Sequence, residues 1–247
     1  MSKAQKQKND YGLAAATAVA VFCMGQIPGS IDAAISKITS AFALTSTSGM
    51  YVATVSCITS VAFSILLSFI AGRKIGYKPL ILFCAVVELF SAVAPFFTTG
   101  FALLLVLRGL FGIGFGGMQS LENTVVTALI PAERRARILG MGMFFGFGMN
   151  CVLQFIGGFL ADIGWNYVFL NHLLLIIPFV IVLAGCARLD FKPAEQDSKP
   201  EADCRPSEKS EKLSAPIYQM WIMMLFTSVF IAPLLIGCSF LSSQINV

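Results

Sequence analysis

The stretch FIAGRKIGYKP, residues Phe69–Pro79, decides the fold of this chain. It is short and basic, it contains Gly76, and it separates two long apolar runs. Lysine and arginine in a short loop between apolar runs are typical of the cytoplasmic side of a membrane protein, and glycine permits the tight turn that such a loop needs. The stretch therefore predicts a cytoplasmic hairpin between two membrane-spanning helices.

The composition of the whole chain indicates an integral membrane protein. Of its 247 residues, 57% are hydrophobic and only 12% are charged. An average soluble domain, by contrast, has about a quarter charged residues. The net charge of +4 comes from segments between the apolar runs, so it does not indicate nucleic-acid binding.

Seven apolar runs are each about long enough to cross a bilayer as a helix. They are Tyr11–Ile31, Met50–Ala71, Leu80–Phe97, Phe101–Val126, Ile138–Leu160, Val168–Cys186 and Ile217–Leu241. Their continuity favours helices, since half-buried strands alternate apolar and polar residues. We therefore predict an all-α membrane protein with a cytoplasmic tail (1–10), a six-span bundle (11–187), a flexible cytoplasmic linker (188–216), a seventh span (217–241) and a short outer tail (242–247).

The distribution of lysine and arginine predicts the orientation in the membrane. The N-terminal tail, the loop after the second run, the loop after the fourth run and the linker are all basic, whereas the alternate loops contain only Lys37. Such an alternation marks the cytoplasmic side. We expect a multi-pass protein of the plasma membrane with a cytoplasmic N-terminus.

Arg108 is the first candidate site residue, because it lies within the apolar sequence LRGLFGIGFGG. It is about eight residues, or roughly 12 Å, into its run, which is near the bilayer midplane. A charge at that depth is unfavourable and normally faces a polar cavity or a partner. The alternative is an arginine that snorkels to the outer interface. Gly112 and Gly116 follow it at the spacing of a tight helix–helix contact.

Other polar residues within the runs extend the candidate site. Glu88 lies at a depth similar to that of Arg108 on the neighbouring run, so an ion pair between them is geometrically possible. Further candidates to line a cavity are Gln26, Glu122, Asn123, Asn150 and Gln154. The alternative for each amide is a hydrogen bond between helices without a ligand.

No enzyme signature accompanies these residues in the sequence. Asp32 and Asp162 are expected at the outer interface, and the single histidine, His172, adds no ligand cluster. The glycine runs lie within membrane helices, so we do not interpret them as nucleotide-binding loops. We therefore expect no catalytic activity, no metal and no cofactor.

Two motifs together resemble the major facilitator superfamily of transporters. Phe69–Pro79 is similar to the signature G-x-L-A-D-R-x-G-R-R between spans two and three of that family, with Gly76 and Lys78 in register and Arg73 in place of the aspartate. Arg108, followed by Gly112 and Gly116, resembles the span-four motif R-x-x-x-G-x-G.

Three later segments also carry the resemblance. PAERRARILG (Pro131–Gly140) resembles the basic peptide that follows span four, and GWNYVFLNHLL resembles the start of span six. The fifth run matches the glycines of a drug/proton antiporter motif at Gly140, Gly157 and Gly158, but not at three other positions.

The resemblance implies two six-helix halves that rock about a central solute site. This chain then supplies the N-terminal half, the linker and the first span of the second half. It implies secondary transport of a small solute, as in drug or sugar efflux members, driven by a proton gradient. Arg108, Glu88, Gln26, Asn150 and Gln154 become candidates for binding and coupling, and Arg73, Gly76 and Lys78 for a gating loop.

The partners implied are the lipid bilayer, the solute, and either a second half or a second copy in a homodimer. The alternative function is a membrane protein that does not transport, either a truncated remnant of such a transporter or an assembly subunit.

Overall fold

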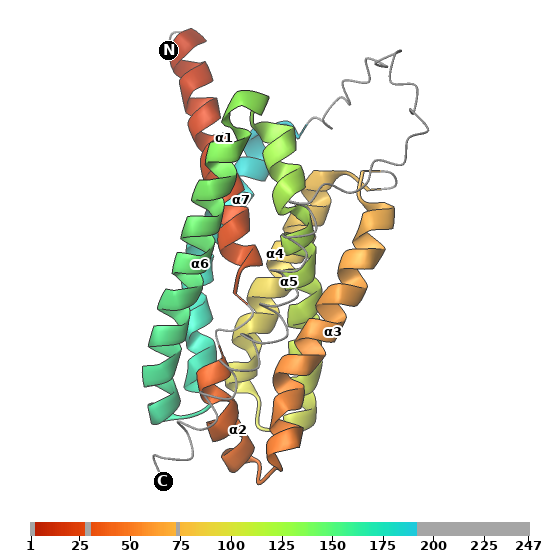
Figure 1. The fold of residues 1–247 in the computed structure, drawn as a ribbon, viewed down its shortest axis with the longest axis vertical. Helices are drawn as coiled ribbons and strands as arrows, with labels where there is room; N and C mark the ends of the chain where they lie inside the picture. Colours follow the sequence, from red (N-terminus) through yellow and green to blue (C-terminus); the bar gives the residue numbers. More distant parts are fainter. Residues whose placement is uncertain (1–2, 28–30, 73–74, 192–247) are drawn as a thin grey trace, which may run out of the picture. The chain divides into compact units, whose positions relative to one another are not determined.

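The computed structural model describes residues 3–27, 31–72 and 75–191. The predicted seventh span, the outer tail and most of the predicted linker lie outside these residues. The described part is a bundle of helices that run up and down along one direction (Figure 1). Its elements are α1 (Lys3–Gly25), η1 (Asp32–Ala34), α2 (Ile35–Ala41), α3 (Ser46–Ile70), α4 (Tyr77–Val93), η2 (Ala94–Phe97), α5 (Phe101–Leu129), α6 (Ala132–Ile163), η3 (Tyr167–Leu175) and α7 (Ile176–Arg188).

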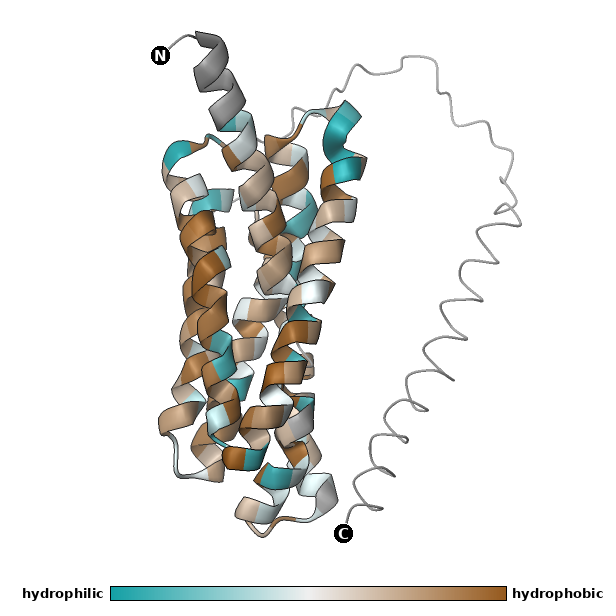
Figure 2. Ribbon diagram, turned by 90° about the vertical axis from the view of Figure 1, so that its left-hand side faces the viewer, coloured by the Kyte–Doolittle hydropathy of each residue, from teal (hydrophilic) through white to brown (hydrophobic). Residues whose placement is uncertain are grey.

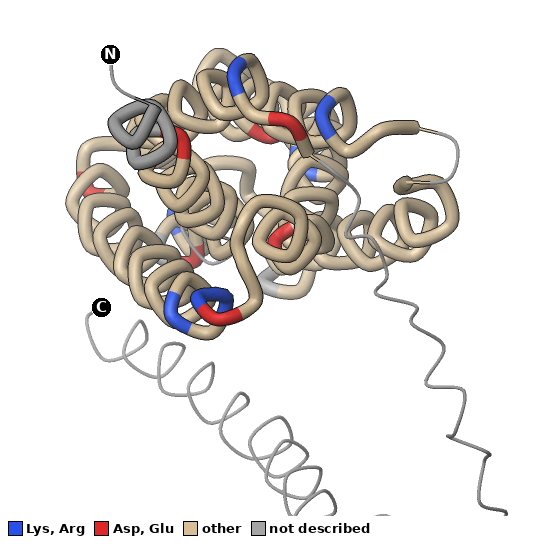
Figure 3. Tube along the Cα trace, turned by 90° about the horizontal axis from the view of Figure 1, so that it is seen from above, with Lys and Arg blue, Asp and Glu red and all other residues tan. Residues whose placement is uncertain are grey.

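The helices have the length and composition of membrane spans. Within the described residues, 5 helical segments are long and apolar enough to cross a bilayer, and Asp10–Gly25 is a shorter apolar helix. Hydrophobic residues dominate the middle of the helices and hydrophilic residues gather mainly towards the two ends (Figure 2). A view along the bundle shows how few Lys, Arg, Asp and Glu residues the helices carry (Figure 3). The prediction of an all-α membrane protein is confirmed.

Helix α5 is the core of the bundle. It packs against α1, α3 and α4, and a much larger share of it is buried than of α3 or α6. Small residues bring α3 and α5 close together, because Gly112 faces the backbone of Ser56 and Gly116 faces that of Ser60. The predicted role of Gly112 and Gly116 in close helix packing is therefore confirmed.

The first span is shorter than predicted, because α1 ends at Gly25 rather than continuing to Ile31. Pro28 follows closely in the sequence, and proline disfavours helix in the residue before it. The chain becomes helical again in η1 and α2. The expected single run is thus divided into separate helical pieces.

The glycine that the α3–α4 turn requires is Gly72 rather than Gly76. Gly72 has a φ of +74°, in the left-handed region that favours glycine, and a side chain there would collide with the Tyr77 hydroxyl. Gly76 is the N-cap of α4 with a φ of −64°, a value that other residues adopt readily. Of the two glycines in Phe69–Pro79, Gly72 is therefore the one on which the turn depends. Arg73 lies outside the described residues.

The basic peptide Pro131–Gly140 is helix rather than loop, since α6 begins at Ala132. Its alanines and arginines are good helix formers, and Glu133 in the first turn complements the helix dipole. Arg135 donates from Nε to the Ile130 carbonyl and from Nη2 to the Thr127 carbonyl, both at 3.0 Å. These carbonyls end α5, so Arg135 caps that helix.

Replacing Arg135 with alanine should lower the free energy of unfolding by about 1–3 kcal/mol, because two hydrogen bonds from a charged donor to helix-end carbonyls are lost. Thermal unfolding in detergent measures this change. Arg137→Ala is the matched control, since Arg137 lies two residues further along α6 and is exposed. Equal loss of stability in the two variants would contradict a capping role for Arg135.

Candidate functional site

Two groups of side chains lie along α5, one around the buried Arg108 and one around the buried Glu122. The arginine cluster consists of Arg108 and its neighbours Asp32, Phe111 and His172. The carboxylate cluster consists of Gln26 and Glu122. Arg108 and Glu122 are fourteen positions apart on α5, which is roughly 21 Å along the helix. The two clusters are therefore separate features of the interior.

Arg108 is almost completely enclosed, with 1% of its surface exposed. Its Nε donates to the Val52 carbonyl of α3 at 3.3 Å, and its guanidinium carbon lies 4.5 Å from the centre of the Phe111 ring. Phe111 is three residues further along α5 and so lies on the same face. Nη1 has no hydrogen-bond partner. The snorkelling alternative is wrong for this arginine, because its side chain turns into the bundle.

Two residues that the sequence did not place at the site accompany Arg108. Asp32, at the start of η1, interacts electrostatically with the guanidinium. His172 of η3 is fully buried, interacts electrostatically with Arg108, and its ring centre lies 6.0 Å from that of Phe111. Sequence analysis assigned Asp32 to the interface and no role to His172. Charge balance was the available signal, since an arginine inside a membrane helix calls for a nearby carboxylate.

The carboxylate cluster joins the segment just after α1 to α5. Gln26, just after α1, donates from Nε2 to both carboxylate oxygens of Glu122, at 3.1 and 3.2 Å. Glu122 is 5% exposed, and Gly25 leaves room for it because a side chain there would collide with Oε1 of Glu122. Glu88 of α4 is fully buried, and neither of its carboxylate oxygens has a hydrogen-bond partner. Its backbone lies against Gly114, which is eight residues, or about 12 Å along α5, from Glu122.

The ion pair considered between Glu88 and Arg108 does not form. The backbone of Glu88 lies against Gly114, where an added Cβ would be 2.5 Å from the Glu88 nitrogen. Gly114 is six residues from Arg108, or about 9 Å along α5. The number of residues from the start of each helix was used as a measure of depth. Because α4 and α5 are antiparallel, these numbers are counted from opposite faces of the membrane, and similar values did not bring Glu88 and Arg108 side by side.

The two remaining candidates, Asn150 and Gln154, lie on α6. Asn150 is half-buried and its Oδ1 has no hydrogen-bond partner, whereas Gln154 is exposed. Gly146, one turn before Asn150, lies against Gln26, since an added Cβ would be 3.0 Å from Gln26 Cγ. The structure thus brings Asn150 near the level of the carboxylate cluster and leaves Gln154 on the outside of the described bundle.

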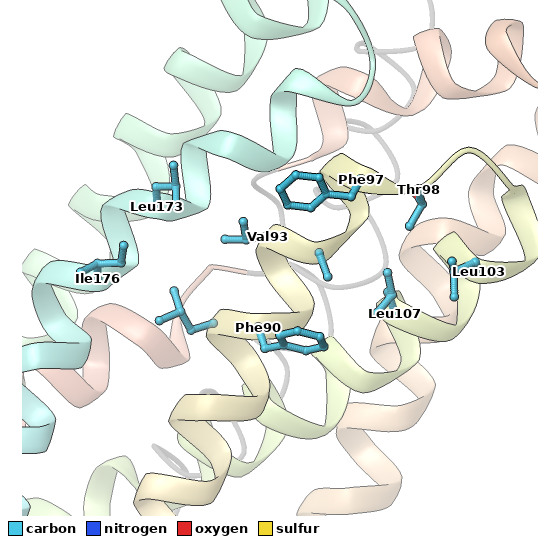
Figure 4. A pocket seen from close by; sticks show the side chains of 10 residues that line it. Phe90, Val93, Phe97, Thr98, Leu103, Leu107, Leu173 and Ile176 are labelled. Atoms are coloured by element: carbon cyan, nitrogen blue, oxygen red, sulfur yellow. The ribbon is translucent and has the colours of Figure 1, made fainter.

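A cavity of about 600 Å³ lies beside α4, η2, α5 and the η3–α7 segment (Figure 4). None of the predicted site residues lines it. Its walls are apolar apart from one threonine, so its chemistry favours an apolar group such as a hydrocarbon chain. They consist of Leu89, Phe90, Val93, Ala94, Phe97, Thr98, Leu103, Leu107, Leu173 and Ile176. Within the described part of the chain, no group of three or more His, Cys, Asp or Glu side chains is placed to hold a metal ion.

Comparison with known proteins gives one family and several partial relatives. The sequence profile of the Major Facilitator Superfamily matches residues 17–246. A synaptic vesicle 2-related protein from Bos taurus is 28% identical over 130 residues, which are 51% of this chain and 23% of that protein. MFS transporter L2 from Phoma sp. is 30% identical over 95 residues, 38% of this chain and 16% of that protein.

A third relative is vacuolar basic amino acid transporter 2 from Saccharomyces cerevisiae. It is 33% identical over 75 residues, which are 30% of this chain and 16% of that protein. The matched segments thus span less than a quarter of the length of each of these relatives.

Proposed function

This chain belongs to the major facilitator superfamily, and we propose that it carries out secondary active transport of a small solute by alternating access. We further propose that a proton gradient drives the cycle and that the direction is export. The names of two relatives, MFS transporter L2 and vacuolar basic amino acid transporter 2, support a transport function.

The observation that carries this proposal is the burial of Arg108 together with its unpartnered Nη1. A guanidinium that is 1% exposed inside an apolar helix, with one nitrogen free of hydrogen bonds, is unfavourable as a purely structural feature. The same geometry suits a solute, because the free Nη1 can donate to an acceptor that enters from the bundle interior. Asp32 would then balance the arginine between transport steps.

The partner that we propose is an opposing six-helix surface, either a second half or a second copy of this bundle. Alternating access needs two bodies that rock against each other. α3 and α6 are the least buried of the long spans and expose large apolar side chains, such as Ile58 at 63% and Phe144 at 73%. We propose that these two helices form much of the contact with the partner.

The turn between α3 and α4 is the proposed gate, with Arg73, Gly76 and Lys78 as its residues. Lys78 Nζ lies 3.2 Å from the Asp190 carboxylate, which ties the start of α4 to the segment after α7. The side chain of Asp190 is 90% exposed, so this pair is worth at most about 1 kcal/mol and can open in each cycle. We propose that this end, with the N-terminus, faces the cytoplasm of a plasma-membrane protein.

Reconstitution of the 247-residue chain in lipid vesicles tests the transport proposal. Labelled glucose, labelled lysine and tetraphenylphosphonium serve as probes of three solute classes, with an imposed proton gradient. We expect saturable flux of at least one probe, which a protonophore abolishes. A flux that does not change when the proton gradient is removed would contradict proton coupling. If folded, inserted protein shows no flux of any probe, the result would support the alternative of a membrane protein that does not transport. The molecular mass of the purified protein in detergent tests the proposal of an opposing six-helix surface. A monomer that shows saturable flux would contradict that proposal.

A further inference from the structure

We propose that the cavity between α4, the start of α5 and the η3–α7 segment is a binding site for a phospholipid, which inserts one acyl chain into it (Figure 4). The cavity has a volume of about 600 Å³, and its lining contains neither Arg108 nor Glu122. The inference goes beyond the proposed transport function and does not depend on it, because it requires only that the bundle spans a membrane.

The side chains of the cavity walls offer little to a polar occupant. Thr98 is the only polar residue among the described residues that line the cavity, and its hydroxyl already donates to the Pro95 carbonyl at 2.8 Å. In the described part of the chain, none of the buried side-chain atoms that lack a hydrogen-bond partner belongs to a lining residue. Water needs several polar partners to occupy a cavity, so these walls do not hold it. An empty cavity loses dispersion contacts along its lining, so a hydrocarbon chain is the favoured occupant.

The position of the cavity matches the depth of one leaflet. Its wall on α4 and η2 extends from Leu89 to Phe97, which is eight residues, or roughly 12 Å along the helix axis. Phe97 lies next to the α4–α5 turn, and the ring of the preceding Phe96 contacts that of Tyr167, a residue type enriched at membrane–water interfaces. The hydrocarbon of one leaflet is about 15 Å thick, half of the bilayer core. The cavity therefore extends from the membrane surface through most of one leaflet, in the direction of the acyl chains.

The cavity is a recess in a face that contacts lipid. Phe90 and Phe97, which line it, are largely exposed, whereas Leu107 of α5 lies deeper and is only 7% exposed. The same apolar surface continues beyond the cavity with exposed residues such as Val86 on α4 and Val180 on α7. In a membrane-spanning bundle such a surface is covered by acyl chains, which are as apolar as leucine. A chain can thus enter the recess sideways from the bilayer while its headgroup stays at the membrane surface.

Counting the phospholipids that stay bound to the 247-residue protein, by native mass spectrometry, tests the inference. The protein is extracted from dioleoylphosphatidylcholine membranes and washed extensively with detergent, and we expect one retained phospholipid per wild-type chain. Val93→Phe places a ring in the recess from its α4 wall and should lower the retained fraction about tenfold or more, the scale of an overpacked contact. Val86→Phe is the matched control, because it adds the same ring two turns earlier on α4 and outside the cavity, and it should retain the lipid.

Photolabelling of the wild type gives a second measurement that does not depend on how well Val93→Phe folds. The protein is placed in vesicles of phosphatidylcholine that carries a diazirine in the middle of one acyl chain, and the labelled positions are mapped by peptide sequencing. A chain in the recess labels Leu107. Lipid that only surrounds the bundle labels exposed positions such as Val86 and does not reach Leu107.

Label at Leu107, together with loss of the lipid in Val93→Phe but not in Val86→Phe, would support the site. If Val93→Phe does not fold, the label at Leu107 decides. Equal retention in the two phenylalanine variants, no retained lipid in the wild type, or no label at Leu107 would overturn the inference. A wild-type dimer that Val93→Phe converts into a monomer would also overturn it, in favour of a second copy as the occupant. None of these measurements involves flux, so their failure leaves the transport proposal unaffected.

Discussion

Replacing Gly116 with alanine is expected to lower the free energy of unfolding by about 3 kcal/mol, at the upper end of the range for overpacked cores. An added Cβ would lie 2.5 Å from the Ser60 carbonyl oxygen and 2.6 Å from its Cα. These are backbone atoms of α3, so no side-chain rotation can relieve the collision. The Ser64 hydroxyl also donates to the Gly116 carbonyl at 3.0 Å, which holds the two helices at this separation. Thermal or denaturant unfolding in detergent measures the loss.

Gly109→Ala is the matched control, on the same helix and facing the same neighbour. There an added Cβ would lie 3.5 Å from Val55 Cγ1, an ordinary contact. Alanine is a better helix former than glycine, so this variant should be unchanged or up to about 1 kcal/mol more stable. The two alanine variants should thus change stability in opposite directions. Similar losses in both would show that the α3–α5 contact is not as close at Gly116 as described.

Replacing Arg108 with alanine is expected to reduce the rate of transport, as kcat/KM, by about 100-fold or more, the scale of effect that mispositioning of a bound solute produces. The change removes the Nε bond to Val52, the stacking over Phe111 and the free Nη1 donor. Vesicle flux of the probe that the wild type carries measures the effect.

Two further variants separate a role in solute binding from a role in folding. Arg108→Lys keeps the charge but cannot reproduce the planar stacking and the fork of donors, so it should restore little of the flux. Arg188→Ala removes an exposed arginine at the end of α7 and should leave the flux near that of the wild type. Near-normal flux in Arg108→Ala, from protein that reaches the membrane with wild-type melting behaviour, would remove Arg108 from the mechanism.

The sequence alone predicted six apolar spans between residues 11 and 187, and within the described residues five helical segments are long and apolar enough to cross a bilayer, with Asp10–Gly25 as a shorter apolar helix. That agreement has a simple cause. A membrane-spanning helix satisfies its own backbone hydrogen bonds and needs a continuous apolar run, so its presence is a local property of the sequence. The errors occurred at the ends of runs, at Gly25 and at Ala132, where helix-breaking and helix-forming residues matter more than hydropathy.

The site was predicted less completely. Arg108, Glu88 and Gln26 were chosen because polar residues in apolar runs are rare, and the structure places all three in the interior. Gln154 was chosen on the same ground but lies exposed. The sequence did not predict this, because the hydropathy of a run does not indicate which face of the helix points into the bundle. Asp32 and His172 were missed as neighbours of Arg108, since they come from distant parts of the chain.

The sequence by itself thus determined the class of protein, the helices and the presence of charge within them, because each depends on residues close together in the chain. Only the tertiary structure decided which charges meet. Arg108 lies with Asp32 and His172 rather than with Glu88, and Glu122 lies with Gln26. The physical reason is helix rotation and register. Contacts such as Gly114 against Glu88 set which side chains share a level and a face, and those contacts join residues that are far apart in the sequence.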